Sequence, residues 1–351
     1  MKSKTIKAIL NKKLNEWIET IKDDNVKSLA KANTIVTGGC IPSMLMNEKP
    51  NDFDIYFKNK ETVKAVAQYY ANKWNEVHGV TTNNIGNKEN VYVLDGAEVE
   101  EWKQGKKTLL EIAPNYNINI PFDKDSTGVS HMITNTTEDR IKVIYPSQGI
   151  ISEEPATQPS MEEMIESADT LYTTESEINE EALNSLPEEV VKEKYRPIFL
   201  TTNAISLSNK MQMIIRFYGE PSEIHANYDF IHCCCYFDFS KNELVTPEES
   251  LLAIMNKDLM YRGSKYPICS MIRTRKFIKR GWNINAGQFV KIAFQISELN
   301  LNDIDILEDQ LVGVDTVYFL QLIRALRKMK ENDANFTYDT NYITTIIDKI
   351  F

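Results

Sequence analysis

The chain has 351 residues, of which 42% are hydrophobic and 26% charged, proportions that are typical of globular proteins and argue against a disordered or membrane-embedded chain. The formal net charge of −10 argues against a nucleic-acid partner. The acidity is local, however: the segment 152–191 holds 12 Asp or Glu and no Lys or Arg, so the remainder has 40 basic and 38 acidic residues, and a nucleic-acid partner is not excluded.

The five cysteines are an odd number and three of them are consecutive, which does not resemble a disulfide framework and favours a reducing, cytoplasmic compartment. No run approaches the roughly 18 apolar residues of a membrane span, and the N-terminus leads into an amphipathic pattern, not into a signal peptide. We therefore expect a soluble protein of the cytoplasm, with no membrane partner.

Apolar residues recur at three- and four-residue steps over about 5–22, which predicts an amphipathic helix within an N-terminal segment 1–32. A strand over 34–37 follows, then a glycine turn and a helix that begins near Ile41. Alternation over Asp52–Phe57 predicts a second strand with Phe53, Ile55 and Phe57 in the core. Glu61–Trp74 has helical periodicity.

The segment 80–150 is strand-like, and we expect it to complete the sheet around an inserted hairpin. Its strand-like runs are 92–94, 118–120 and 140–145. The acidic, proline-containing segment 152–194 is predicted to be a flexible insert, either a loop or weakly helical. Strands are predicted at 197–200 and 211–217, whereas 231–239 fits either a strand or a short helix.

From Pro247 onward the pattern is helical. The predicted helices are 248–258, 267–280, 286–297, 304–311, 313–330 and 339–350. The predicted domains are therefore an N-terminal helix over 1–32, a catalytic domain over 33–151 and 195–246, the acidic insert over 152–194, and a helical domain over 247–351. The fold class is α+β, a mixed sheet with helices followed by a mainly helical C-terminal domain.

The most informative pattern is Gly38-Gly39 followed by Asp52-Phe53-Asp54. The glycines follow a predicted strand, and 12 residues separate Gly39 from Asp52, the length of one helix and a turn. Strand side chains alternate, so both carboxylates leave the same face and can reach a single ion. A glycine turn that opens a helix is suited to phosphate. The pattern predicts a site for a metal ion and the phosphates it binds.

This pattern resembles the signature of the DNA polymerase β-like nucleotidyltransferase superfamily. The resemblance implies a polymerase β-like fold, a glycine turn at Gly38 and Gly39 that holds nucleotide phosphates, and metal-binding carboxylates at Asp52 and Asp54. Where that family often has serine after its glycine, this chain has Cys40, and Ser43 is the next hydroxyl available.

The stretch from Tyr228 to Asp238 has a further, partial resemblance, to a motif of bacterial tRNA CCA-adding enzymes and poly(A) polymerases. Asp229-Phe230 align with that motif, whereas Asn227 and Tyr228 stand in place of its arginines. More closely, most of 33–77 and 195–315 resembles uncharacterised nucleotidyltransferase-like proteins of tailed bacteriophages.

The resemblance implies a two-metal site for Mg²⁺ (or Mn²⁺) that a third carboxylate completes. Asp229 is the first choice for that carboxylate and Asp238 the alternative; Asp229 is equally compatible with a capping role. Arg216, at the end of a predicted strand, is a candidate partner for phosphate or for an aspartate.

A basic stretch surrounds 262–280, between the aromatic residues Tyr266 and Trp282. It is compatible with phosphate or RNA binding and equally with a solvated helix, and Lys265 and Arg273 are the best individual candidates. The run Cys233-Cys234-Cys235 does not predict a zinc site, because consecutive strand residues alternate faces; buried apolar roles are favoured.

We therefore expect an enzyme, a metal-dependent nucleotidyltransferase that moves NMP from an NTP to an acceptor and releases pyrophosphate. The preferred acceptor is an RNA 3′ end resembling that of tRNA. The alternatives are NMP transfer to a protein or small molecule, and an inactive binding module that keeps the fold. The sequence leaves the oligomeric state open.

Overall fold

The computed structural model describes residues 1–78, 91–113, 133, 136–144, 193–311, 326, 329–330, 337 and 342–343. The predicted strand 118–120 and the acidic insert up to residue 192 lie outside them, as do most residues of the predicted helices 313–330 and 339–350. The chain forms two compact units. The first comprises Met1–Glu153, Glu188–His225 and Cys233–Pro247, and the second comprises Glu154–Pro187, Ala226–His232 and Glu248–Phe351.

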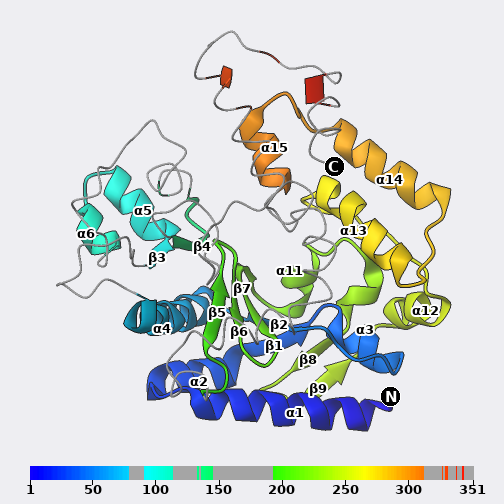
Figure 1. Cartoon of the computed structure of the whole chain (residues 1–351), viewed down its shortest axis with the longest axis horizontal. Helices are drawn as coiled ribbons and strands as arrows, with labels where there is room; N and C mark the ends of the chain where they lie inside the picture. Colours follow the sequence, from blue (N-terminus) through cyan, green and yellow to red (C-terminus); the bar gives the residue numbers. More distant parts are fainter. Residues whose placement is uncertain are drawn as a thin grey trace. The chain divides into compact units, whose positions relative to one another are not determined.

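The first unit is built on a seven-stranded mixed sheet with the order β5-β6-β7-β2-β1-β8-β9. The strands are β1 (Thr34–Thr37), β2 (Phe53–Phe57), β5 (Pro197–Leu200), β6 (Ala204–Leu207), β7 (Met211–Tyr218), β8 (Tyr236–Asp238) and β9 (Glu243–Val245). β2 pairs antiparallel with β1 and parallel with β7, so strands far apart in sequence meet at the centre of the sheet. Figure 1 shows β1, β2 and β7 side by side.

Helices α1 (Ser3–Thr20), α2 (Asp24–Asn33) and α4 (Lys60–His78) accompany this sheet (Figure 1). Phe53, Ile55 and Phe57 are buried, as their alternation predicts. Trp17 of α1 packs against Phe57 and donates a 2.8 Å hydrogen bond to the Tyr70 hydroxyl of α4. The apolar face of β2 is thus covered, which leaves the opposite face and the strand ends for polar side chains.

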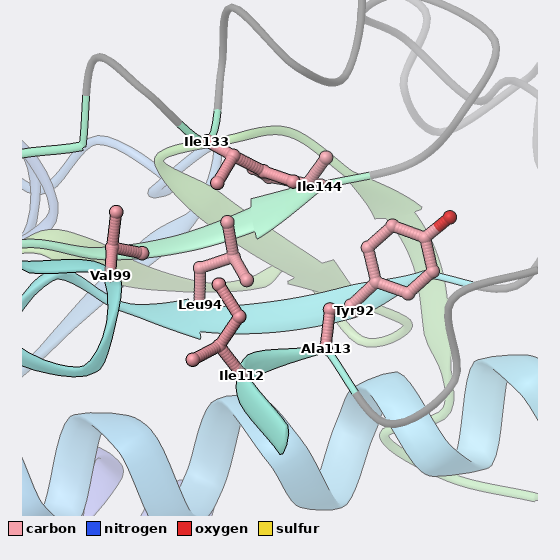
Figure 2. Close-up of a cluster of buried hydrophobic side chains, with 7 residues drawn as sticks. All are labelled: Tyr92, Leu94, Val99, Ile112, Ala113, Ile133 and Ile144. Atoms are coloured by element: carbon pink, nitrogen blue, oxygen red, sulfur yellow. The ribbon is translucent and has the colours of Figure 1, made fainter. Parts of the chain in front are cut away.

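Strands β3 (Tyr92–Asp95) and β4 (Ile141–Ile144) form a separate two-stranded sheet, so the prediction that this segment completes the main sheet is wrong. Helices α5 (Gly96–Lys103) and α6 (Leu109–Ile112) close over it, and Figure 2 shows their shared apolar cluster. A Cβ on Gly96 would lie 1.7 Å from the Thr137 carbonyl oxygen, so only glycine lets the chain turn directly from β3 into α5.

In the part of the chain that the structure describes, the second unit combines the stretch 226–232 with four helices. They are α12 (Glu248–Asn256), α13 (Pro267–Lys279), α14 (Ala286–Ser297) and α15 (Ile304–Leu311). Phe230 forms a β-bridge with Tyr261, and Gln310 donates to the Lys265 carbonyl at 2.9 Å. Within the described residues, no helix is long and apolar enough to cross a bilayer.

The mixed sheet with helices and the helical C-terminal region are confirmed. The run 231–239, for which a strand or a short helix was predicted, contains both, because a 3₁₀ turn over Ile231–Cys234 precedes β8. The narrower expectation of a polymerase β-like sheet stays a prediction, as do the domain boundaries.

Candidate functional site

The antiparallel pairing of β1 and β2 brings the glycines and aspartates to the same end of these two central strands, and so to one edge of the sheet. β1 ends at Thr37, directly opposite Asp54 near the start of β2. Gly38 follows β1 and Asp52 precedes β2, so the turn and both carboxylates meet at this edge, as their spacing predicts. We call the edge formed by Gly38, Gly39, Asp52 and Asp54 the acidic edge.

Gly38 is required for the geometry of the acidic edge. Its φ is +90°, and a Cβ at this position would stand 2.7 Å from Asp54 Oδ2. The Gly38 N–H donates to the Cys233 carbonyl on the other side, at 3.3 Å. The backbone is therefore held between the 3₁₀ turn that contains Cys233 and the Asp54 carboxylate, where a side chain would displace that carboxylate.

Gly39 has a different role, because its φ of −70° and ψ of −20° suit any residue. A Cβ here would meet no atom within 4 Å, so the absent side chain leaves open space beside the acidic edge. The helix that Gly39 caps, α3 (Cys40–Leu45), has 6 residues and contributes little dipole. Ser43 lies one turn inside it and is 4% exposed, so it does not present a hydroxyl at the surface.

Cys40 occupies the position where a hydroxyl is expected. Burial raises the pKa of its thiol well above the usual range, and the negative charges of Asp54 and Asp52 raise it further. A protonated, buried thiol is a weak donor, so Cys40 is a poor ligand for phosphate. The carboxylates of Asp54 and Asp52 are thus close enough to the start of α3 to act on this thiol.

A row of polar side chains crosses the sheet through Asp54. Gln212 of β7 pairs with Asp54, Ser206 of β6 pairs with Gln212, and Tyr236 of β8 pairs with Thr37. Directly paired residues point to the same face, so the row Ser206, Gln212, Asp54, Thr37, Tyr236 lines one side of the sheet. Among the described residues, the side-chain amide of Gln212 and the carboxylate of Asp52 make no hydrogen bond or ion pair.

Thr37 links this row to His225 of α11 (Pro221–His225). The Thr37 hydroxyl donates to the Cys235 carbonyl at 2.9 Å, and His225 Nε2 lies 2.8 Å from Thr37 Oγ1. A hydroxyl has one proton, so the imidazole N–H donates to Thr37. The His225 ring also packs on Tyr236, with 5.7 Å between ring centroids. This buried contact fixes the strand neighbour of Asp54.

Asp238, the alternative third carboxylate, lies away from the acidic edge. It pairs with Ile35, two residues before Thr37 on β1, and forms a 2.7 Å ion pair with Lys58. Burial opposes its ionisation, but hydrogen bonds from Lys58 and Ser240 outweigh burial and lower the pKa of its carboxyl. Asp238 is therefore a structural partner of Lys58 and does not complete a metal site.

Arg216 is not beside the acidic edge along the strands. β7 is parallel to β2, and Gln212 is opposite Asp54, whereas Arg216 falls where the register shifts toward the Phe57–Tyr218 pair. The role of Arg216 as a partner for phosphate or for an aspartate stays a prediction.

Asp229, Lys265 and Arg273 belong to the second unit. Arg273 Nε lies 2.9 Å from Asp229 Oδ2, and Lys265 Nζ stands 5.7 Å from the centre of the Tyr266 ring. The role of Asp229 as a third metal ligand stays a prediction, and within its own unit it serves as the partner of Arg273.

Cys234 and Cys235 are buried and Cys233 is half-buried, which agrees with the predicted apolar role. In the part of the chain that the structure describes, no three His, Cys, Asp or Glu residues are placed to hold a metal ion together. Among these residues, the acidic edge brings together two carboxylates without a third metal-binding side chain.

Comparison with known proteins identifies the family. The model of Gad2, described as the Gabija anti-defense 2 family protein, matches residues 8–257, well over half of the chain. The chain belongs to the Gabija anti-defense 2 family.

A curated relative, "Gabija anti-defense 2" of Bacillus phage SPbetaL7, is 26% identical over 141 residues. The aligned region covers 39% of this chain and 34% of that protein, so the chain matches about a third of its relative's length. No solved structure matches this chain.

The predicted membership of the polymerase β-like nucleotidyltransferases is wrong, as is the partial likeness to CCA-adding enzymes and poly(A) polymerases, because the Gabija anti-defense 2 model spans both motifs. Two glycines and two alternating aspartates are short patterns, and any strand–turn–helix unit beside an acidic strand can produce them. They describe local chemistry and do not identify a family.

The sequence did not single out Thr37, Gln212 or Tyr236. Thr37 and Gln212 carry no local signal beyond strand propensity, and their importance comes from the pairing partners that the sheet gives them. His225 has no local signal either, because its partner Thr37 is 188 residues away in the chain.

Proposed function

We propose that this chain counters a host defence, as the name of its family indicates, and that it does so by nucleotidyl transfer at the acidic edge. The observation that carries the proposal is the contact of Gly38 with the Asp54 carboxylate. This contact keeps a carboxylate oxygen near Asp52 and the open space at Gly39, which supports the proposal. The Bacillus phage relative supports a phage-encoded protein that acts in the host cytoplasm.

The two carboxylates fit a hard divalent cation, Mg²⁺ or Mn²⁺, which prefers oxygen ligands and is often bound through one or two carboxylates plus substrate phosphates. Such an ion would offset negative charge on the phosphates during transfer. Asp52 and Asp54 would hold it, and the missing third carboxylate is consistent with an ion that enters together with the nucleotide.

The reaction is an attack on the α-phosphorus of an NTP by an acceptor hydroxyl. A new P–O bond forms to the acceptor, the bond to the pyrophosphate oxygen breaks, and the hydroxyl proton leaves to solvent. The chain contributes orientation: Gly39 leaves space for the phosphates, and the Gly38 backbone keeps the Asp54 carboxylate at the edge.

Two acceptor classes have support. The family name favours a component of the Gabija defence as the acceptor. The basic residues of α13, where Arg275 and Lys279 are exposed, favour an RNA 3′ end. A third possibility, a binding module without catalysis, would act through the same surface with no transfer.

The proposal is tested by incubating the purified chain with Mg²⁺ and each α-labelled NTP. Total RNA, proteins from cells that carry the Gabija defence, and metabolites are supplied as separate fractions. We expect label in one fraction, and about a hundredfold less in Asp52→Asn and Asp54→Asn. Glu61→Gln is the matched control, because it removes one exposed carboxylate outside the acidic edge.

An infection assay tests whether the acidic edge is required to counter the host defence. Cells that carry the Gabija defence should permit more plaques when they express the chain, and the gain should vanish with Asp52→Asn but persist with Glu61→Gln. Full protection of the phage by Asp52→Asn and Asp54→Asn, together with no label in any fraction, would favour the binding module and refute the enzyme.

A further inference from the structure

We propose that the exposed side of α14 (Ala286–Ser297) packs against the same side of α14 in a second copy of this chain, with the two helices antiparallel. The pairing makes the protein a homodimer with two-fold symmetry, a state that the sequence leaves open. The inference goes beyond the proposed function and does not depend on it, because the acidic edge contributes no residue to this helix.

One side of α14 packs within the second unit. Ile292 is buried, and Gln288 accepts a 2.9 Å hydrogen bond from the Tyr261 N–H. Gln295 Nε2 donates to the Ser264 carbonyl at 2.8 Å. Residues three and four apart share one side of a helix, so these contacts all use the same side of α14. The opposite side points away from them.

That opposite side is exposed and apolar. Val290 is 51% exposed and Phe294 is 70% exposed. The exposed residues that share this side, which we call the α14 face, are Phe289, Val290, Ala293, Phe294 and Ser297. An exposed helix side normally carries charged residues, and contiguous apolar surface marks an interaction site. The α14 face therefore has the composition of a surface that packs against another apolar surface.

Two charges beside the α14 face indicate what that other surface is. Lys291 and Glu298 are the only charged residues between 282 and 299. They lie three residues before and four residues after Phe294, and Glu298 keeps helical backbone angles, so both border the α14 face on the same margin. Both are exposed, and the Glu298 carboxylate makes no hydrogen bond or ion pair with another described residue. Lys291 Nζ makes one long contact, 3.5 Å from the Tyr261 carbonyl oxygen.

This charged margin is complementary to itself when the helix is reversed. A two-fold axis near Phe294 places Lys291 of each copy opposite Glu298 of the other copy, because the two residues are equally distant from the axis. The two Phe294 side chains then meet at the centre of the contact. In a parallel pair, the charged margin would instead face the other margin, where Phe289 and Ile296 offer no charge. The charge pattern thus favours two antiparallel copies.

Sedimentation velocity of the full chain, over a wide range of protein concentration, tests the pairing. One helix of 12 residues is about 18 Å long, less than a standard interface spans, so we expect a reversible dimer with a dissociation constant on the order of micromolar. Phe294→Ser should weaken the dimer by more than about tenfold, because it removes the aromatic side chain at the centre of the contact. Circular dichroism checks that this variant is folded, which its exposed position favours.

Charge reversal tests the antiparallel arrangement. Lys291→Glu and Glu298→Lys should each weaken self-association by about tenfold, because each variant places like charges opposite one another twice. A mixture of the two variants should recover the dimer as a heterodimer, since every charge then faces its opposite. Lys12→Glu is the matched control: it reverses one exposed lysine of α1 and changes the net charge equally, and it should leave the dissociation constant close to that of the wild type.

Three results would overturn the inference. The first is a monomer at every concentration; if a component of the Gabija defence then bound through Phe294, the α14 face would belong to that partner. The second is a dimer that Phe294→Ser leaves intact, which would place the contact elsewhere. The third is a mixture of Lys291→Glu and Glu298→Lys that stays as weak as either variant alone, which would exclude the antiparallel pair.

Discussion

The Gly38 backbone and the Asp54 carboxylate lie so close that a Cβ on Gly38 would stand 2.7 Å from Asp54 Oδ2. The contact joins the end of β1 to the start of β2 and leaves no room for a side chain between them. Gly38 therefore has two roles: it permits the turn after β1, and it determines where the Asp54 carboxylate lies.

Gly38→Ala should therefore damage both stability and the site. We expect a loss of about 2 kcal/mol in the free energy of unfolding, because the positive φ is strained for alanine and the methyl group displaces the carboxylate. Urea unfolding measures the first effect and calorimetric titration with Mg²⁺ and NTP the second. Gly39→Ala is the control: its Cβ meets no atom, so its stability should stay near that of the wild type. Equal unfolding midpoints for Gly38→Ala and the wild type would contradict the prediction.

Thr37→Val removes a hydroxyl from a buried position while keeping the shape of the side chain. His225 Nε2 and the Cys235 carbonyl both lose their contact with Thr37 Oγ1, so we expect a destabilisation of about 2 kcal/mol in urea unfolding. Thr20→Val, at a partly exposed helix end, should cost less. A destabilisation of Thr37→Val no larger than that of Thr20→Val would indicate that the His225 contact contributes little.

Asp238 should make the first unit sensitive to acid. The pKa of its carboxyl is lower in the folded chain than in the unfolded chain, because the hydrogen bonds from Lys58 and Ser240 outweigh burial. Its contribution to stability is therefore present above the unfolded pKa of about 4 and is lost as the pH falls through the lower folded value. Unfolding monitored between pH 5 and pH 2, by a probe within the first unit, should show a smaller acid loss in Asp238→Asn. Parallel curves for variant and wild type would argue against this ion pair.

His232 should make the stability of the second unit depend on pH, over a higher pH range than Asp238 does in the first unit. Burial, together with the smaller effect of the positive charge of Arg280, lowers the pKa of its imidazole to about 3. The unfolded chain takes up the proton near pH 6.5 while the folded chain does not, so stability falls as the pH drops from about 6.5 to about 3. The slope approaches about 1.4 kcal/mol per pH unit. His232→Phe, which keeps an aromatic ring against Phe277 and Trp282, should flatten this slope. An unchanged slope would assign the effect to another group.

The sequence located several elements because their signals are local. Alternation identified β1 and β2 almost to the residue, and the helical period identified α4, α13 and α14. The helix α2 and the helices α5 and α6 were missed, since they are short or joined to a neighbour without a strong break. The runs 92–94 and 140–145 were assigned to the wrong sheet, because the alternating pattern of a strand does not specify which strand it pairs with.

By itself, the sequence determined that a glycine turn and two carboxylates on one strand face would occur together. Both features depend on residue type and on spacings of a few residues, which the backbone converts directly into geometry. The tertiary structure alone decided which groups join them. It placed Gln212 beside Asp54, tied Thr37 to His225, and paired Asp238 with Lys58 instead of with a metal site. These relationships join residues far apart in the chain and follow from strand register and burial, which no local pattern encodes.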